Sequence, residues 1–397
     1  MSESNNVQYD ILIVGGGMVG LTLANLLNDS GLKIGVVEKF EPKVVTDEID
    51  IRVSAINRAS SDIFKAIGAW PEMATRAGVY HDMHVWDSTG AGVIHFDSAE
   101  VGLDALGYII ENTVIQQALQ RCAEHAENVD WLCPVSINAI ELNDESGDEW
   151  QRLKLEDGRT LQARLIVAAD GARSQVRAAA NIEFERVSYG QQAIVCTVET
   201  EQPHAETAWQ CFTPDGPLAF LPLMNGESSI VWSLQESKVD AMLALDDEAF
   251  CRELEQAFEY QLGSVKLASS RAAFPLGHGH VDQYVKNGLA LVGDAAHNIH
   301  PLAGQGANLG FLDAASLAEV ITQAQIASRQ WYALHTLRKY ERARKGGNHL
   351  MESSMTAFKL LFSNDNPLLS TVRNAGLVMV DQAPIIKNQF LRHAMGS

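Results

Sequence analysis

The segment from Asp10 to Glu38 constrains the fold more strongly than any other part of the chain. The apolar run Ile11–Val14 predicts a buried strand, a leucine-rich stretch with helical spacing follows it, and Ile34–Val37 predicts a second buried strand. Two strands joined by a helix in so short a segment form a βαβ unit, whose strands lie parallel in one sheet. The sequence therefore predicts an α/β fold.

Glycines in the first turn of this unit, and an acid at the end of its second strand, indicate a binding function. Gly15 makes the tight turn, Gly17 lets a pyrophosphate approach the backbone, and Gly20 lets the helix pack against the strand. Glu38 can accept hydrogen bonds from the hydroxyls of an adenosine ribose. The pattern predicts an adenine dinucleotide without separating FAD from NAD. Because the chain carries one such fingerprint and not two, either it binds a single nucleotide or a nicotinamide nucleotide visits without a domain of its own.

A second glycine-rich segment, Gly288 to Asp313, places an acid at the end of another predicted strand. The apolar run Leu289–Val292 predicts a strand buried on both faces, so Asp294 would stand at its carboxyl end, where open α/β sheets bind their ligands. A helix is predicted from Ala307, and its free N–H groups would stabilise negative charge in the preceding loop. The alternative is an ordinary strand, loop and helix, which the concentration of Asp, His, Pro, Gly and Gln in this loop disfavours.

Two further residues stand where a nucleotide could be held, each with a structural alternative. The run Leu165–Ala169 predicts another buried strand, and Asp170 follows it, although an Asp that caps the next helix explains this position equally well. Arg52 precedes a predicted helix whose apolar face starts at Ile56, and it could bind a pyrophosphate with two hydrogen bonds. An exposed surface arginine is the alternative.

A change of pattern between Val187 and Arg271 predicts a second domain inserted into the first. Alternating apolar and polar residues indicate strands of an antiparallel sheet with one buried face, interrupted by one helix at Asp246–Leu262. Tyr80–Phe96 predicts a hairpin, which we assign to the same domain. Phe220 and Trp232 could wall an apolar pocket there, although positions in the core explain them too.

Charge and cysteine content exclude several classes of protein. The net charge of −20 has the wrong sign for sequence-independent binding of nucleic acid. From Trp331 onward, nine Lys or Arg stand against four Asp or Glu, which favours contact with an anionic surface or an acidic partner, with a solvated helical face as the alternative. Five dispersed cysteines predict reduced thiols and no zinc site. We expect a cytoplasmic protein that docks peripherally at the inner membrane.

Three motifs in register along the chain carry a resemblance to a known family. GGGMVG with Glu38, ADGARSQVR, and GDAAHNIHPLAGQGANLGFLDA resemble the flavoprotein aromatic hydroxylases built on the p-hydroxybenzoate hydroxylase fold. Within that group, RVSAIN, ENTVIQQAL and FTPDGPLAFLPL are most similar to the bacterial ubiquinone-biosynthesis hydroxylases, which act on polyprenylated phenols or quinols. The chain lacks an obvious tyrosine pair or arginine clamp for a carboxylate, as suits an uncharged prenylated ring.

The resemblance implies FAD as the bound cofactor and NADPH or NADH as a transient electron donor. The residues that it implies for FAD, together with the strand-end Asp170, are Gly15, Gly17, Gly20, Glu38, Arg52, Asn112, Asp170, Asp294, Pro301, Gly304, Gln305, Gly306, Ala307 and Asn308. His300, beside Pro301, is the one nomination for a catalytic base, and a structural histidine is its alternative. No metal is expected.

The expected architecture follows from these motifs. It is an α/β fold with a Rossmann-like FAD-binding domain, an inserted antiparallel-sheet substrate domain and C-terminal helices. The boundaries are 1–79, 97–186 and 272–330 for the discontinuous FAD-binding domain, 80–96 and 187–271 for the substrate domain, and 331–397 for the helical segment.

The implied reaction is a ring hydroxylation. NAD(P)H would reduce FAD, O₂ would add at flavin C4a, and the hydroperoxide would pass its distal oxygen to an electron-rich ring carbon. The protein would orient the ring, exclude water and favour the phenolate. Two other classes share this fold, namely an FAD-dependent reductase of prenyl chains and a non-catalytic prenyl-lipid carrier. The sequence leaves open which ring carbon is hydroxylated.

Overall fold

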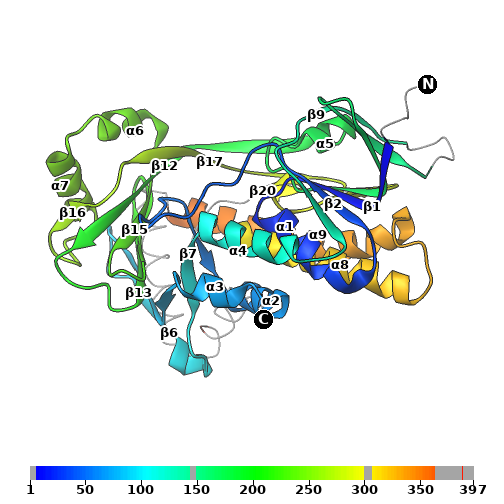
Figure 1. The fold of residues 1–397 in the computed structure, drawn as a ribbon. Coiled ribbons are helices and arrows are strands. Elements are labelled where there is room, and N and C mark those ends of the chain that lie inside the picture. Colours follow the sequence, from blue (N-terminus) through cyan, green and yellow to red (C-terminus); the bar gives the residue numbers. More distant parts are fainter. Residues whose placement is uncertain (1–5, 144–148, 299–305, 363–386, 388–397) are drawn as a thin grey trace.

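The computed structural model describes residues 6–143, 149–298, 306–362 and 387, which form three β-sheets flanked by helices (Figure 1). The first sheet runs in the order β18-β19-β11-β1-β2-β8, with β10 and β9 added antiparallel beside β11. Its strands are β1 (Asn6–Val14), β2 (Ile34–Val37), β8 (Val129–Leu132), β9 (Ile137–Glu141), β10 (Gln151–Leu155), β11 (Thr160–Ala168), β18 (Val285–Lys286) and β19 (Leu289–Leu291). Strands β19, β11, β1, β2 and β8 are parallel, so their carboxyl ends share one edge.

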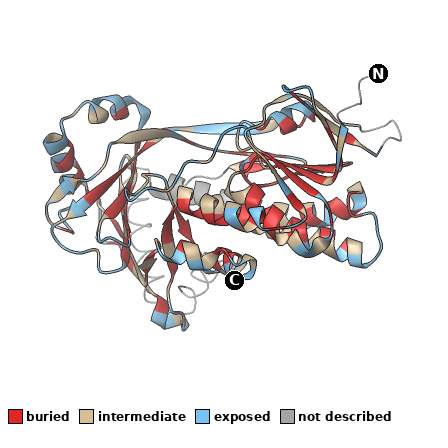
Figure 2. Ribbon diagram, in the orientation of Figure 1, coloured by how far each residue is buried: buried red, intermediate tan, exposed pale blue. Residues whose placement is uncertain are grey.

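Helices cover one face of this sheet (Figure 1). They are α1 (Met18–Leu26), α4 (Asn112–Glu124), α8 (Gly306–Ile326) and α9 (Leu334–Phe362). Buried residues line the strands and the helix faces turned toward them (Figure 2). Among them, Ile11, Leu12 and Ile13 of β1 are fully buried, as expected of a strand at the centre of a parallel sheet.

The second sheet extends away from the first (Figure 1) and runs in the order β20-β17-β12-β15-β14-β13-β5-β6, with β16 beside β12. Its strands are β5 (Asp82–Asp87), β6 (Val93–Asp97), β12 (Phe184–Thr200), β13 (Thr207–Thr213), β14 (Gly216–Pro222), β15 (Ser228–Gln235), β16 (Val265–Leu267), β17 (Ala272–Val281) and β20 (His297–Asn298). Helices α6 (Glu236–Leu243) and α7 (Asp247–Ala257) lie at the end of this sheet that is far from the first sheet.

A small third sheet, β3-β7-β4, packs against the second. Its strands are β3 (Val53–Ile56), β4 (Gly78–Tyr80) and β7 (Gly107–Glu111). The remaining helices are α2 (Arg58–Ile67), α3 (Trp70–Ala74), α5 (Gln175–Ala179) and the short 3₁₀ turns η1 (Asn28–Ser30), η2 (Ser98–Val101) and η3 (Gly293–Ala295).

The predicted fold class is confirmed, and so are the βαβ unit, the hairpin and the strands at β11 and β19. Four expectations are wrong in detail. Ile56 belongs to β3, because helix α2 begins only after Asn57, whose side chain accepts a hydrogen bond from Ser60 N. Phe274 and Pro275, in the range 272–330 that we expected to belong with the first sheet, lie in β17 of the second sheet. The inserted segment has two helices, α6 and α7, and β5 pairs parallel with β13 in a sheet expected to be wholly antiparallel.

Among the residues that the structure describes, no helix is long and apolar enough to cross a membrane. All five cysteines are free thiols, as the sequence predicts.

Candidate cofactor and substrate cleft

Three loops meet at the carboxyl edge of the first sheet. They follow β1 at Gly15, β11 at Ala169 and β19 at Gly293. Gly15 has φ +108°, and a Cβ there would lie 2.4 Å from the carbonyl oxygen of Ala169. Only glycine fits, because both the backbone conformation and the neighbouring loop exclude a side chain. The predicted tight turn is therefore also the contact between two strand ends.

Gly17 differs from its neighbours in having empty space beside it. It precedes α1 with φ −75°, and a Cβ there would meet no atom within 4 Å. The first turn of α1 thus presents backbone N–H groups to an open region, which is the arrangement that binds phosphate.

The peptide groups around Gly16 are held from two sides. Glu38 Oε2 accepts a hydrogen bond from Gly16 N at 2.7 Å, and Glu38 Oε1 accepts one from Phe40 N at 2.9 Å. Gln116, on α4, donates from Nε2 to Gly16 O at 2.8 Å. Glu38 therefore fixes the glycine turn itself, while its half-buried carboxylate keeps further lone pairs for the ribose contact that we predicted.

A cleft of about 450 Å³ opens at these strand ends and runs between the first and second sheets. Its floor includes Gly17, Gly293 and Asp294, and its walls come from β3, β12, β14, β15 and β17. The apolar side chains on those walls include Val53, Ala55, Phe184, Ala193, Val195, Leu221, Val231, Phe274, Pro275 and Leu276, and Arg186 and His278 line the same walls. The cleft therefore has polar backbone at the strand ends and walls that are mainly, but not wholly, apolar.

Asp294 lies where the sequence placed it, at the strand end, with its side chain exposed to the cleft. Protein nevertheless surrounds the carboxyl group, and this burial raises its pKa, although His297 and Arg52 act in the opposite direction. A carboxylate that water reaches only in part is stabilised by a hydrogen bond from a hydroxyl group, because that bond replaces the missing hydration.

Arg52 and Asn112 both line the cleft. The Arg52 guanidinium lies over the Phe274 ring at 5.7 Å from its centroid, and Asn112 Oδ1 accepts a hydrogen bond from Ser54 Oγ at 2.7 Å. The structure thus places both residues at the cleft that Asp294 also lines, and their contact with FAD stays a prediction.

Asp170 binds free N–H groups at the start of α5, whose N-cap residue is Ser174. Its Oδ2 accepts hydrogen bonds from Gln175 N at 2.8 Å and Val176 N at 3.3 Å, at the start of α5. The cleft is lined by its neighbours Ala169 and Gly171 and not by Asp170. The capping alternative accounts for what is seen, and a contact of Asp170 with FAD stays a prediction.

The loop before α8 is described only in part. Pro301, Gly304 and Gln305, and with them the nominated base His300, lie outside the described residues. Gly306 and Ala307 line the cleft.

Asn308 faces a different neighbour. Its Nδ2 donates to Ala55 O at 2.7 Å, and its Oδ1 accepts from Asn57 N at 3.1 Å. The side chain of Asn308 therefore ties α8 to the end of β3, and a contact with FAD through this residue stays a prediction.

Phe220 and Trp232 are wrong as pocket residues. Phe220 is fully buried and stacks on Phe258 at 3.8 Å, while Trp232 is 4% exposed and lies 6.0 Å from Phe250 of α7. Successive side chains of a strand point to opposite faces, so the cleft receives the adjacent residues, Leu221 and Val231. The alternative of core positions is the correct one.

Sequence reasoning assigned no role to two buried charged residues beside the cleft. Arg177 donates to Ala295 O at 2.9 Å and to Ala172 O at 2.7 Å, which joins the loops after β19 and β11. Asp313, fully buried on α8, accepts a hydrogen bond from Gly293 N at 3.1 Å. The available signal was a charged residue within an apolar helical face, which requires a partner when buried.

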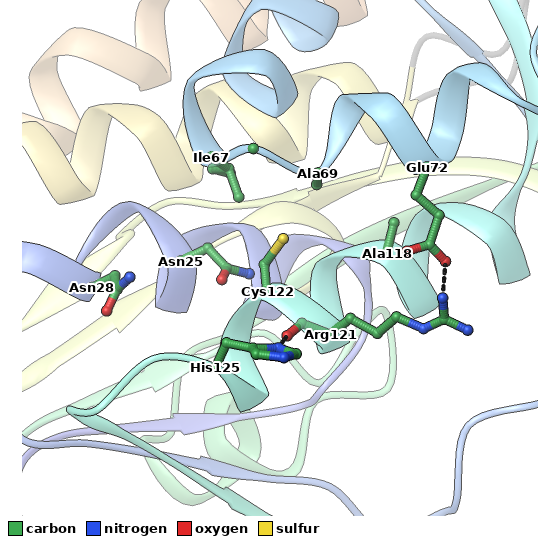
Figure 3. A pocket seen from close by; sticks show the side chains of 10 residues that line it. Asn25, Asn28, Ile67, Ala69, Glu72, Ala118, Arg121, Cys122 and His125 are labelled. Carbon is green, nitrogen blue, oxygen red and sulfur yellow. Dashed lines mark hydrogen bonds and ion pairs between the residues drawn. The ribbon is translucent and has the colours of Figure 1, made fainter.

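A second cavity, of about 470 Å³, lies among α1, α2, α3 and α4 (Figure 3). Arg121 and Glu72 form an ion pair of 3.0 Å there, and the Cys122 thiol has a raised pKa because of burial. None of the predicted site residues lines this cavity. No cluster of metal-binding side chains occurs within the described ranges either.

The residues around the cleft fit FAD. Gly17 leaves space for a pyrophosphate at a helix N-terminus, and Asp294 presents an acceptor farther along the cleft. The walls of β14, β15 and β17 offer apolar surface beyond it.

Comparison with known proteins agrees with this geometry. Residues 8–345 match the family described as FAD binding domain. The chain is 39% identical over 394 residues to the 3-demethoxyubiquinol 3-hydroxylase of Escherichia coli (strain K12), with 98% of this chain and 99% of that protein covered. It is 38% identical over 391 residues to the ubiquinone hydroxylase UbiL of Rhodospirillum rubrum, with 98% and 90% covered.

Among solved structures, PqsL of Pseudomonas aeruginosa, a probable FAD-dependent monooxygenase, is 25% identical with a TM-score of 0.78, over 94% of this chain and 100% of that chain. Neither curated relative is named as a prenyl-chain reductase or a lipid carrier, so those two alternatives gain no support. The chain belongs to the FAD-binding-domain family and is a flavin-dependent monooxygenase of the aromatic hydroxylase type.

Proposed function

We propose that this enzyme hydroxylates the ring of a polyprenylated phenol or quinol on the route to ubiquinone. The observation that carries the proposal is the apolar far wall of the cleft, formed by Val53, Leu221 and Val231. Leu221 belongs to the hydrophobic cluster between the second and third sheets, and Val53 and Val231 pack against this cluster. The names of the two curated relatives support the same class of substrate.

The residues proposed to hold FAD divide by location. Gly15, Gly17, Gly20 and the Glu38 carboxylate would hold its pyrophosphate and adenosine end, and Asp294 its ribityl hydroxyls. When bound, FAD supplies electron transfer from NADPH or NADH and the activation of O₂. Because the chain shows one nucleotide fingerprint, the nicotinamide nucleotide would bind transiently.

The chain's own contribution is orientation and the exclusion of water. Leu221 and Val231 present hydrocarbon on neighbouring strands, which are paired so that Phe220 lies opposite Ile230 and Ala219 opposite Val231. Such a wall holds an uncharged ring without hydrogen bonds and leaves no site for ordered water. Leu221 and Val231 themselves offer no charge to a substrate carboxylate, and the arginines that line the cleft, Arg52 and Arg186, lie on other segments.

The direct test is product analysis. The purified protein should be yellow and release FAD, and with NAD(P)H and a short-chain prenylated phenol it should yield a product that carries one atom from ¹⁸O₂. Protein that is colourless and cannot be reconstituted with FAD would refute the proposal. A product with a saturated prenyl chain and no added oxygen would instead identify a reductase.

We also propose that α9 offers a positive face to an anionic membrane surface or an acidic partner. The support is a group of exposed basic residues on one side of the helix, Arg338, Lys339 and Arg342. Arg344 and Lys345 do not belong to it, although sequence spacing places them in the same cluster. Arg344 pairs with buried Asp313 at 2.8 Å, and Lys345 Nζ contacts the Asp282 carboxylate at 3.8 Å.

The docking test therefore uses the three exposed residues alone. Replacing Arg338, Lys339 and Arg342 with Glu should leave FAD content and turnover of a soluble short-chain phenol unchanged, while activity on substrate in anionic vesicles falls. The loss should be largest at low ionic strength, where such attraction is strongest. If the variant keeps wild-type activity on both substrates at low salt, docking through this face is ruled out.

A further inference from the structure

A buried carboxylate connects the cofactor loop to the C-terminal helix. Asp313 of α8 has no exposed surface, and each of its oxygens has two partners. Oδ2 accepts from Gly293 N at 3.1 Å and lies 2.5 Å from His297 Nε2. Oδ1 accepts from Arg344 Nε at 2.8 Å and from Asn348 Nδ2 at 3.2 Å. Gly293 is the residue directly before Asp294, which lines the cleft.

Helix α9 is attached to the same strand end by two further contacts. Tyr340 OH donates to Leu291 O, the last residue of β19, at 2.7 Å. The Glu341 carboxylate accepts from Tyr284 N at 2.8 Å. One side of α9 therefore holds both β19 and the loop after it, whereas Arg342 on the other side is exposed.

The charge balance of this cluster depends on Arg344. Burial would raise the pKa of Asp313, but His297 and Arg344 reverse the effect, so the pKa is lowered and the group is ionised. Arg344 is the cation whose charge is independent of pH, because a guanidinium does not lose its proton in proteins.

Other titratable groups face this cluster from every packed element. Tyr340 has a strongly raised pKa, because of burial first and of Asp313 second, so it is neutral. Tyr284 stacks near His297 at 5.9 Å, and His280 lies opposite His297 in the β17–β20 pair with His349 of α9 against it at 4.5 Å. Asp294 itself interacts with His297 across the loop.

We infer that Arg344 is a positioning residue for the FAD-binding loop. By neutralising Asp313 at every pH, it keeps the acceptor for Gly293 N–H in place and so holds Asp294 toward the cleft. The inference rests on the proposed role of Asp294 in binding FAD. Helix α9 would thus help to shape the cofactor site, although it lies far from the glycine-rich motifs in the sequence and its exposed face is basic.

The experiment compares Arg344→Met with Arg342→Met, two matched substitutions of arginines two residues apart on one helix. FAD affinity is measured by flavin fluorescence titration of apoprotein at neutral pH. Arg342→Met should match the wild type. Arg344→Met should raise the Kd for FAD at least tenfold.

Calorimetry of the apoproteins separates positioning from a general loss of structure. A raised Kd for FAD in an Arg344→Met variant that is still folded at the titration temperature places the loss in the cofactor loop. An unchanged Kd for Arg344→Met overturns the inference.

Arg344→Lys provides the second variant, since it keeps the charge without the Nε geometry. Its Kd for FAD should rise by less than threefold, and a tenfold rise contradicts charge neutralisation even if Arg344→Met does not fold. Wild-type protein that fails to bind FAD would refute the proposed function instead.

Discussion

Gln116 on α4 donates a hydrogen bond across 2.8 Å to the carbonyl oxygen of Gly16, inside the glycine-rich turn. The C=O and N–H of a trans peptide point in opposite directions, so this bond turns the N–H of Gly17 away from α4. Gln116→Leu removes the donor, and we expect the Kd for FAD to rise about fivefold, the equivalent of ~1 kcal/mol for one hydrogen bond. Fluorescence titration checks this, with Gln117→Leu as the matched control. An equal Kd for both variants would show that the bond does not organise the turn.

Gly17 and Gly20 should respond differently to substitution. A Cβ at Gly17 meets no neighbour, so Gly17→Val should leave the melting temperature of apoprotein near that of wild type while abolishing FAD binding. A Cβ at Gly20 would lie 2.0 Å from Gly15 O, so Gly20→Ala should lower the apoprotein melting temperature. Calorimetry of apoprotein with parallel FAD titration measures both. If Gly17→Val bound FAD normally, the pyrophosphate would lie elsewhere.

Asp294→Asn should stabilise the apoprotein and weaken FAD binding. Burial raises the pKa of Asp294 in the folded protein. The folded state is therefore favoured while Asp294 is protonated, and its free energy of unfolding falls as pH rises through that pKa and the group ionises. The variant should melt higher than wild type at neutral pH, and the difference should vanish below about pH 4, the ordinary range of Asp. The Kd for FAD should rise roughly tenfold or more, because a charged acceptor is lost. A lower melting temperature at neutral pH would contradict the sign of this effect.

Phe220 and Leu221 are adjacent on β14 but face opposite sides of the sheet. Phe220→Ala opens a cavity against Phe258 and should cost ~3–5 kcal/mol of unfolding free energy, with the KM for a prenylated substrate unchanged. Leu221→Ala should raise that KM about tenfold, because the cleft loses apolar contact. Rates are normalised to bound flavin, so partial unfolding does not imitate a change in KM. A raised KM in Phe220→Ala alone would reverse the assignment of faces.

The parallel core and its ligand edge could be predicted because they depend on local signals. Short apolar runs that end in glycine or aspartate mark both the strand and its carboxyl end, and parallel pairing then brings Gly15, Ala169 and Gly293 together. The mistaken helix at Ile56 came from the helical spacing it shares with Ile63. The overlooked signal was Asn57, a helix cap that accepts from Ser60 N and so starts α2 after Ile56.

Other parts of the site depend on contacts between distant segments. The alternation of side chains along a strand shows that Phe220 and Leu221 lie on opposite faces of the sheet. Only the position of α7 decides that the face of Phe220 belongs to the core packed against this helix. Arg344 and Asp313 are 31 residues apart, and a basic cluster on a helix has the same pattern whether its members face solvent or a buried acid. Sequence spacing alone therefore could not separate Arg344 from Arg342.

Strand β12 has a mechanical consequence for substrate entry. Its 17 residues pair with β17 from Phe184, beside the cofactor cleft, to Val195 in the inserted sheet, and at ~3.3 Å per residue the strand is about 55 Å long. Its pairing with β17 shifts register only between Ser188 and Gln191, where Gly190 has φ +63°. A continuous ribbon of two strands resists bending except at such a bulge, so any bending of this ribbon would be concentrated between Ser188 and Gln191. Because the cleft is lined by Arg186 before this bulge and by Ala193 after it, such bending would change the width of the cleft.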